Sequence, residues 1–308
     1  MRKISFVIPC YGSENTISNV INDIISTVKK EDDYEIICVN DCSKDHVFDV
    51  LRDIAKTNNR VKVISLAKNF GQHNALMCGF RHVSGDIIVC LDDDGQTDPK
   101  QCYKLIDALN ENVDVAIAKY PTKHHNVFRN FGSFVNKKMS EWLCDFPKNI
   151  ASTSYSASKR FVIDEITNYT QPFTFLGGIF VRTTKNLVNV DIEHKDRLCG
   201  KSGYTFTSLL SLWLNGFTAF SVKPLRAASF LGIFTSLVGF IFGLYIIIRK
   251  FIDPSRLIGY SSIMCAILFV GGVIMMILGL MGEYIGRIYI CLNNSPQYVI
   301  KEKINFDE

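Results

Sequence analysis

Short β-branched runs alternate with longer amphipathic segments over the first 120 residues of the chain. The runs predict five strands, at residues 4–9, 34–40, 61–66, 85–91 and 113–118. The segments between them predict four helices, at residues 15–29, 44–58, 72–83 and 99–110. Strands that alternate with helices of this length form parallel sheets with right-handed crossovers and helices on both faces. The pattern therefore predicts an α/β domain built on a mostly parallel sheet.

Two long stretches in the last third of the chain contain no charged residue. They run from Ala227 to Ile248 and from Leu257 to Gly282. At 1.5 Å per residue the first is roughly 33 Å long, which matches the roughly 30 Å hydrocarbon core of a bilayer. A buried core helix of this length normally carries a charge on its solvent face. The pattern favours two transmembrane helices, at about 227–249 and 257–282, over two core helices.

Two shorter segments between the predicted sheet and the first span are apolar and aromatic. Residues 127–145 place such side chains at helical spacing beside Arg129, Lys137 and Lys138, and residues 204–218 form the second segment. Helices of this kind lie on membrane surfaces. Core packing is the alternative, but beside a membrane hairpin we expect interfacial helices at both places.

The composition narrows the class of protein. The 34 basic and 30 acidic residues leave a net charge of +4, which fits neither a disordered tail nor a strongly cationic protein that binds nucleic acid. The ten cysteines include no CxxC pair and no zinc-type Cys/His spacing, so we interpret them as free thiols.

The order of these segments predicts how the chain is organised around a membrane. The N-terminal apolar run is interrupted by Pro9 and is too short for a signal sequence. We therefore expect a cytoplasmic catalytic domain over residues 1–222, a two-helix hairpin in the inner (cytoplasmic) membrane over residues 223–286, and a cytoplasmic tail over residues 287–308.

The string GDIIVCLDDDGQTDP ends a predicted strand in three aspartates, Asp92, Asp93 and Asp94. Adjacent like charges repel, so the cluster is unfavourable unless a cation binds it. Ligands of parallel sheets lie beyond the carboxyl ends of the strands, where this cluster falls. Carboxylates of Asp92 and Asp94, with the amide oxygen of Gln96, suit Mg²⁺ or Mn²⁺ bound to a diphosphate. The alternative is a solvated acidic turn.

Polar residues also follow the first two predicted strands. Asp41 and Ser43 end the second, where a carboxylate can accept hydrogen bonds from a base or ribose, and a helix cap is a compatible alternative. The first strand ends in Pro9-Cys10-Tyr11-Gly12, which brings an aromatic ring to the same rim. We interpret His73 as a helix-start residue rather than a ligand.

Five motifs, followed by the two apolar stretches, carry a family resemblance: ISFVIPCYGSEN, VNDCSKD, NFGQHNALMCGF, LDDDGQTDP and GKSGY. In this order, and over about residues 4–300, the chain resembles membrane-anchored family 2 glycosyltransferases of the polyprenyl-phosphate branch. That branch includes dolichol-phosphate mannose synthases, bactoprenol glucosyltransferases and undecaprenyl-phosphate aminoarabinose transferases. The resemblance implies a GT-A fold, a nucleotide-sugar donor, a divalent cation (Mg²⁺ or Mn²⁺) and a polyprenyl phosphate acceptor. Asp41 makes uridine the expected base of the donor.

The resemblance also implies roles for individual residues. The metal would be held by Asp92, Asp94 and Gln96. Asp94 and Arg197 would be catalytic, with Arg197 neutralising charge on the leaving group. The nucleotide pocket would be lined by Pro9, Tyr11, Glu14, Asp41 and Asp92. The acceptor phosphate would meet Arg129, Lys137, Lys138 and Ser202. The sequence departs from the family pattern at Gly12, Ser13 and Asn40, which bears on which donor is used more than on activity, and at Gly95, which replaces the usual leucine of the metal motif.

The implied reaction is an inverting single displacement that makes a polyprenyl-phosphate sugar for modification of cell-envelope glycans. A phosphate monoester is largely a dianion at neutral pH and needs no strong general base. Gly239 and Gly243, then Gly282 and Gly286, have the spacing of close helix contacts. The resemblance also implies assembly, so we expect a homo-oligomer such as a tetramer. A different lipid or glycan acceptor, a processive synthase and a catalytically silent membrane scaffold remain as alternatives.

Overall fold

The chain folds into two compact units in the computed structural model. The model describes residues 2–120, 147, 150, 151, 153–193, 222–252 and 260–306. The first unit comprises Met1–Leu212 with Ser295–Glu308, and the second Trp213–Asn294. The segments expected to form interfacial helices lie outside the described residues, so those helices stay predictions.

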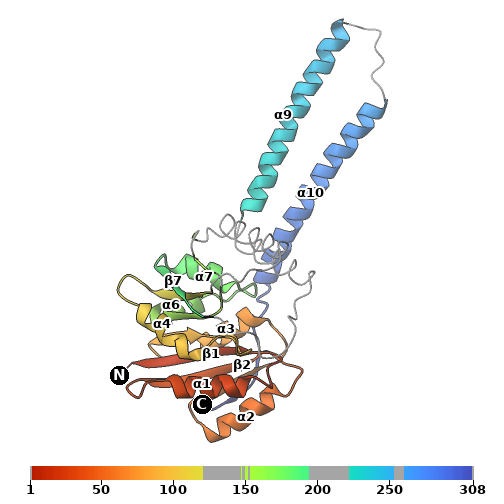
Figure 1. The fold of residues 1–308 in the computed structure, drawn as a ribbon. Helices are drawn as coiled ribbons and strands as arrows, with labels where there is room; N and C mark the ends of the chain where they lie inside the picture. The colour runs from red at the N-terminus through yellow and green to blue at the C-terminus, as the bar shows by residue number, and fades with distance from the viewer. Residues whose placement is uncertain are drawn as a thin grey trace. The chain divides into compact units, whose positions relative to one another are not determined.

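A mixed sheet of eight described strands lies at the centre of the first unit, in the order β7-β5-β6-β4-β1-β2-β3-β8. Strands β1, β2 and β7 are labelled in Figure 1. The strands are β1 (Lys3–Cys10), β2 (Asp33–Asn40), β3 (Val61–Leu66), β4 (Ile87–Cys90), β5 (Val115–Lys119), β6 (Ser156–Lys159), β7 (Leu187–Asp191) and β8 (Ile300–Ile304). The first four pair in parallel, whereas β6 is antiparallel to both β4 and β5, and β8 is antiparallel to β3. The five predicted strands and the α/β class are confirmed.

Helices cover both faces of this sheet. They are α1 (Ile17–Thr27), α2 (Val47–Thr57), α3 (Gln72–Phe80), α4 (Cys102–Ala108) after a 3-10 turn at Pro99–Gln101, α6 (Arg160–Thr167) and α7 (Leu176–Thr183). Successive side chains of a strand point to opposite faces. Phe6 and Ile8 of β1 accordingly join the core formed with α1, α2 and α4. On the other face a side chain at Gly79 of α3 would collide with Val7, so glycine allows this helix to lie close to β1.

The second unit contains two long helices, α9 (Lys223–Ile252) and α10 (Tyr260–Leu292). Both are long and apolar enough to cross a membrane, judged by length and composition. Large apolar side chains along them are exposed, such as Phe230 at 72% and Met275 at 70%. The helices contain the described parts of both predicted spans, and α10 continues beyond the second one. In that extension Arg287 Nη2 lies 2.7 Å from Glu283 Oε1.

After α10 the chain returns to the first unit and adds the edge strand β8. Ile304 pairs with Val63 of β3, and the backbone N–H of Ala67 donates to the oxygen of Val299 at 2.8 Å. These residues were predicted only as part of a cytoplasmic tail. The pattern IKEKI alternates apolar and charged residues, which is typical of a half-exposed edge strand, but five residues are too few to predict one.

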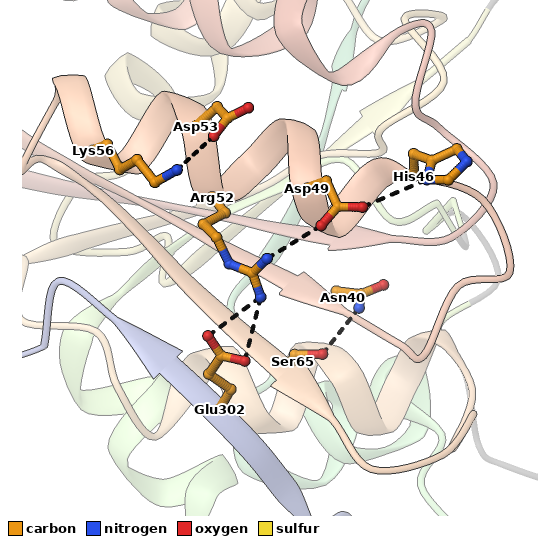
Figure 2. A network of polar contacts seen from close by, with 8 residues as sticks. All are labelled: Asn40, His46, Asp49, Arg52, Asp53, Lys56, Ser65 and Glu302. Carbon is orange, nitrogen blue, oxygen red and sulfur yellow. Dashed lines mark hydrogen bonds and ion pairs between the residues drawn. The ribbon is translucent and has the colours of Figure 1, made fainter.

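Two polar contacts of different character hold this C-terminal segment. On the surface, Arg52 of α2 lies 3.5 Å from Glu302 of β8 (Figure 2). Gln297 is buried, and its Oε1 accepts from Arg81 Nη1 at 2.9 Å. Its Nε2 donates to the backbone oxygen of Gln171 at 3.0 Å and to Thr174 Oγ1 at 2.7 Å. Gln297 therefore connects the C-terminal segment to the loop between α6 and α7.

We predict that these two contacts differ in their contribution to stability. Gln297→Ala should lower the free energy of unfolding by about 1–3 kcal/mol, because it leaves buried donors and acceptors without partners. Glu302→Gln should cost roughly 0–1 kcal/mol, because the pair it breaks is largely solvated. Chemical unfolding of the two variants and the original chain in the same detergent measures the difference. Equal losses would contradict the anchoring role of Gln297.

Candidate functional site

The carboxyl ends of three adjacent parallel strands meet at one edge of the sheet. Strands β4, β1 and β2 are neighbours, and the chain leaves them at Leu91, Tyr11 and Asp41 respectively. Ligands of parallel sheets bind at this edge. The fold thus brings the polar residues that follow three strands, far apart in sequence, to one rim.

The three consecutive aspartates of this rim have different surroundings. Asp93 turns toward the β1 loop: its Oδ2 accepts from the backbone N–H of Tyr11 at 2.9 Å, and its backbone oxygen accepts from Thr16 Oγ1 at 2.6 Å. Burial raises the pKa of Asp93 to about 6. Asp93 therefore joins the ends of β1 and β4, while Asp92 and Asp94 make other contacts.

Neutral donors hold the Asp92 and Asp94 carboxylates. Gln72 Nε2 donates to Asp92 Oδ1 at 2.8 Å, and Ser154 Oγ donates to Asp92 Oδ2 at 2.6 Å. Asp94 Oδ1 accepts from the backbone N–H of Gln96 at 3.0 Å. The structure therefore places Asp92, Asp94 and Gln96, the predicted metal residues, in one short turn.

The residues of this turn can supply only some of the ligands that a cation needs. Within the described residues, no group of three His, Cys, Asp or Glu side chains is placed to hold a metal. Mg²⁺ usually binds one or two carboxylates together with waters and substrate phosphates. The two rim carboxylates are donors of the kind that such a cation takes when a diphosphate completes its shell.

Asp41 organises the start of α3. Its Oδ1 accepts from the backbone N–H of Phe70 at 2.7 Å and its Oδ2 from that of Gly71 at 2.8 Å. Gly71 has φ +87°, a left-handed conformation that favours glycine. Burial raises the pKa of Asp41, against the effect of these two hydrogen bonds. Contact of Asp41 with a nucleotide stays a prediction, because its carboxylate already binds backbone.

The other predicted nucleotide residues cross-link the β1 and β2 loops. Glu14 Oε2 accepts from the backbone N–H of His46 at 2.9 Å, and the N–H of Glu14 donates to Asp45 Oδ2 at 2.9 Å. Tyr11 is 50% exposed at the rim, whereas Pro9 is buried within β1. Asp45 Oδ1 also accepts from the backbone N–H of Val47 at 3.3 Å, but the N-cap residue of α2 is His46, which makes no side-chain cap hydrogen bond, so neither Asp41 nor Ser43 caps this helix.

Three residues near the acids were missed in the sequence analysis as site residues. Gln72 and Ser154 contact Asp92 directly. Burial, aided by the charges of Asp92 and Asp94, raises the pKa of Tyr120. Gln72 stood in a recognised motif, NFGQHNALMCGF, but Ser154 comes to Asp92 through the antiparallel pairing of β6, which no local pattern indicated.

Five predicted residues lie outside the described part of the chain. They are Arg129, Lys137, Lys138, Arg197 and Ser202. Their roles toward the acceptor phosphate and the leaving group stay predictions.

Comparison with known proteins covers both units. The family model "Glycosyl transferase family 2" matches residues 5–167, and the model "GtrB C-terminal hairpin" matches residues 223–288. A bactoprenol glucosyl transferase derived from prophage SfII in Shigella flexneri is 30% identical, over 97% of this chain and 98% of that protein. An undecaprenyl-phosphate 4-deoxy-4-formamido-L-arabinose transferase of Klebsiella pneumoniae is 29% identical, over 100% of this chain and 95% of the relative.

A solved structure agrees on the fold. Glucosyl-3-phosphoglycerate synthase from Mycobacterium tuberculosis, crystallised with Mn²⁺, UDP and glucosyl-3-phosphoglycerate, has a TM-score of 0.52 at 20% identity. The likeness covers 70% of this chain and 78% of the synthase. It confirms the GT-A fold predicted from the sequence.

We predict a pH-dependent contribution to stability from His73 of α3. Its ring lies edge-on to Phe175 at 5.8 Å, and the described residues offer Nδ1 no hydrogen-bond partner. Burial lowers the pKa of His73 to about 4 from its ordinary 6.5. The unfolded chain therefore binds more protons than the folded chain between these values, and stability should fall as the pH drops from 6.5 to 4.

His73→Gln should flatten this part of the stability profile, because glutamine does not titrate. Thermal unfolding midpoints across pH 4–7 in EDTA measure the slope. His46→Gln, at an exposed position, serves as the control and should keep the original slope. An unchanged slope in His73→Gln would refute the role of His73.

Proposed function

Since the chain belongs to glycosyl transferase family 2, we propose that it transfers a sugar from a nucleoside diphosphate sugar to a polyprenyl phosphate. The product is a polyprenyl-phosphate sugar used in modifying cell-envelope glycans. The observation that carries this proposal is that one chain joins an acidic rim on a GT-A sheet to two long, exposed apolar helices. The names of the relatives, a bactoprenol glucosyl transferase and an undecaprenyl-phosphate transferase, support a polyprenyl acceptor.

The donor diphosphate and its cation belong at the Asp92 and Asp94 turn in this proposal. Asp92, Asp94 and Gln96 hold Mg²⁺ or Mn²⁺, the metals found with UDP in structures of the mycobacterial synthase. When bound, the cation stabilises the negative charge that develops on the departing nucleoside diphosphate. The rim residues Tyr11, Glu14 and Asp41 line the nucleotide side of the site, and Arg197 neutralises leaving-group charge.

The acceptor phosphate supplies the nucleophile. A phosphate monoester has a second pKa near 6 and is largely a dianion at neutral pH. The protein's task is to orient that oxygen toward the anomeric carbon and exclude water. We assign this task to Arg129, Lys137, Lys138 and Ser202. Direct attack in a single displacement inverts the anomeric configuration.

The two apolar helices anchor the enzyme where its acceptor lies. We propose that α9 and α10 cross the cytoplasmic membrane as a hairpin and that the sheet unit is cytoplasmic. The match of residues 223–288 to the hairpin family model and the exposed apolar surface support this topology. The interfacial helices at 127–145 and 204–218, and assembly into a homo-oligomer such as a tetramer, complete the proposal.

Incubation of the purified full-length protein with a panel of nucleotide sugars and undecaprenyl phosphate tests the reaction. Mass analysis should reveal a lipid whose mass equals undecaprenyl phosphate plus one sugar residue. Undecaprenol, which lacks the phosphate, is the acceptor control and should yield no product. A sugar transferred to a nonphosphorylated lipid or to a glycan instead would contradict the proposed acceptor.

Asp94→Asn tests the metal role in the same assay. Removal of one carboxylate should lower turnover by roughly 100-fold or more at saturating Mn²⁺, since it removes several kcal/mol of charge stabilisation. Asp53→Asn, on the surface of α2, is the matched control and should leave turnover unchanged. Normal turnover in Asp94→Asn would contradict the assignment.

A further inference from the structure

The hydrogen bonds of Asp92 come from two separate elements that meet only in the folded chain. In the antiparallel β4–β6 ladder, Cys90 pairs with Ser156 and Val89 with Ala157. Two residues further along the same register, Asp92 comes opposite Ser154, and the two side chains form the 2.6 Å hydrogen bond. Because β6 is antiparallel to β4, the chain just before β6 places the hydroxyl of Ser154 beside Asp92 Oδ2.

The second donor comes from the first residue of α3. The N–H groups of Phe70 and Gly71 are fixed by Asp41, so the start of this helix is held to the end of β2. Asn74 Nδ2 donates to the backbone oxygens of Phe70 at 2.9 Å and Pro172 at 3.3 Å, which holds the first turn from the other side. The side chain of Gln72 therefore extends from a fixed helix start, and its Nε2 donates to Asp92 Oδ1 at 2.8 Å.

The chemistry of these donors suits a metal ligand. A carboxylate oxygen can accept two hydrogen bonds or bind a cation beside one. Gln72 and Ser154 each donate to a different oxygen of Asp92, and both donors are neutral. Lysines are the corresponding donors to two other carboxylates of this unit: Lys62 lies 2.9 Å from Glu35, and Lys159 lies 2.8 Å from Asp114.

We propose that Gln72 and Ser154 are positioning residues, which orient the Asp92 carboxylate for the divalent cation of the donor site. This inference rests on the proposed function for the identity of the ligand. Outer hydrogen bonds of this kind fix the direction of a ligand's lone pairs, and their loss typically lowers metal affinity by about 10–100-fold.

Calorimetric titration of Mn²⁺ into the full-length protein with saturating UDP tests the proposal directly. Gln72→Leu and Ser154→Ala should each weaken Mn²⁺ binding by about 10-fold or more. Ser154→Thr, which retains the hydroxyl, should restore affinity to near that of the original chain. Gln171→Leu and Ser26→Ala are matched controls: Gln171 contacts Gln297 through its backbone oxygen, and Ser26 lies on α1. Both should bind Mn²⁺ normally.

A double-mutant cycle separates positioning from general damage. In an Asp92→Asn background, Gln72→Leu should cause no further loss, because the carboxylate that Gln72 orients is gone. Unchanged Mn²⁺ affinity in Gln72→Leu and Ser154→Ala would overturn the proposal, as would equal losses in Ser154→Thr and Ser154→Ala. Absence of any Mn²⁺ binding by the original chain would overturn it as well.

The transfer assay keeps this proposal distinct from the proposed function. If Mn²⁺ binding depends on Gln72 and Ser154 as stated but no sugar reaches undecaprenyl phosphate, the positioning role is supported and the acceptor is wrong. If sugar transfer occurs while both variants bind Mn²⁺ normally, the function is supported and the positioning role is wrong.

Discussion

The shared direction of β1, β2 and β4 is the constraint on which the rest of this molecule depends. Because the three strands are parallel neighbours, the residues that follow them must meet at one edge. That edge receives an aspartate from β2 and three from the end of β4, a concentration of negative charge that needs compensation. The loops compensate with hydrogen bonds from backbone and neutral side chains, and these bonds define the geometry of the site.

Carboxylates within the sheet unit are satisfied in two ways. Toward the amino-terminal part of the strands, Glu35 accepts hydrogen bonds from Ser5, Ser84 and Lys62. Burial alone would raise the pKa of Glu35, but these hydrogen bonds lower it by more, so the pKa lies below its ordinary value. That group is a stable ion pair buried beside hydroxyls. At the carboxyl edge, Asp41 and Asp92 receive N–H and O–H donors without a lysine in those contacts. Glu35 is thus held in part by charge pairing, whereas these contacts of Asp41 and Asp92 come from neutral donors.

Local patterns predicted the part of the fold that is local. The first five strands and the four helices between them follow from hydrophobic periodicity, and the two apolar helices follow from long stretches without a charged residue. The acidic turn follows from the strand that precedes it. Strands β6, β7 and β8 were not predicted, because their pairing joins segments distant in sequence: Ser156 with Cys90, Leu187 with Val115, and Ile304 with Val63. The role of Asp93 was also invisible in sequence, since only the folded β1 loop distinguishes it from Asp92 and Asp94.

The same reasoning explains what could be foreseen at the site. Asp92 and Asp94 are one residue apart after a strand, so their shared location is a local property. Gln72 and Ser154 reach Asp92 through a helix start and an antiparallel ladder, and only tertiary structure brings them there.

The central claim is that the Asp92 and Asp94 carboxylates together hold the cation of the donor diphosphate. Anomalous scattering at the manganese absorption edge, from crystals of the full-length protein with Mn²⁺ and UDP, tests it most directly. The account predicts one manganese peak at coordination distance from an oxygen of each carboxylate and from the diphosphate. A manganese and UDP site elsewhere on the chain, with both aspartates bound only to protein groups, would contradict it.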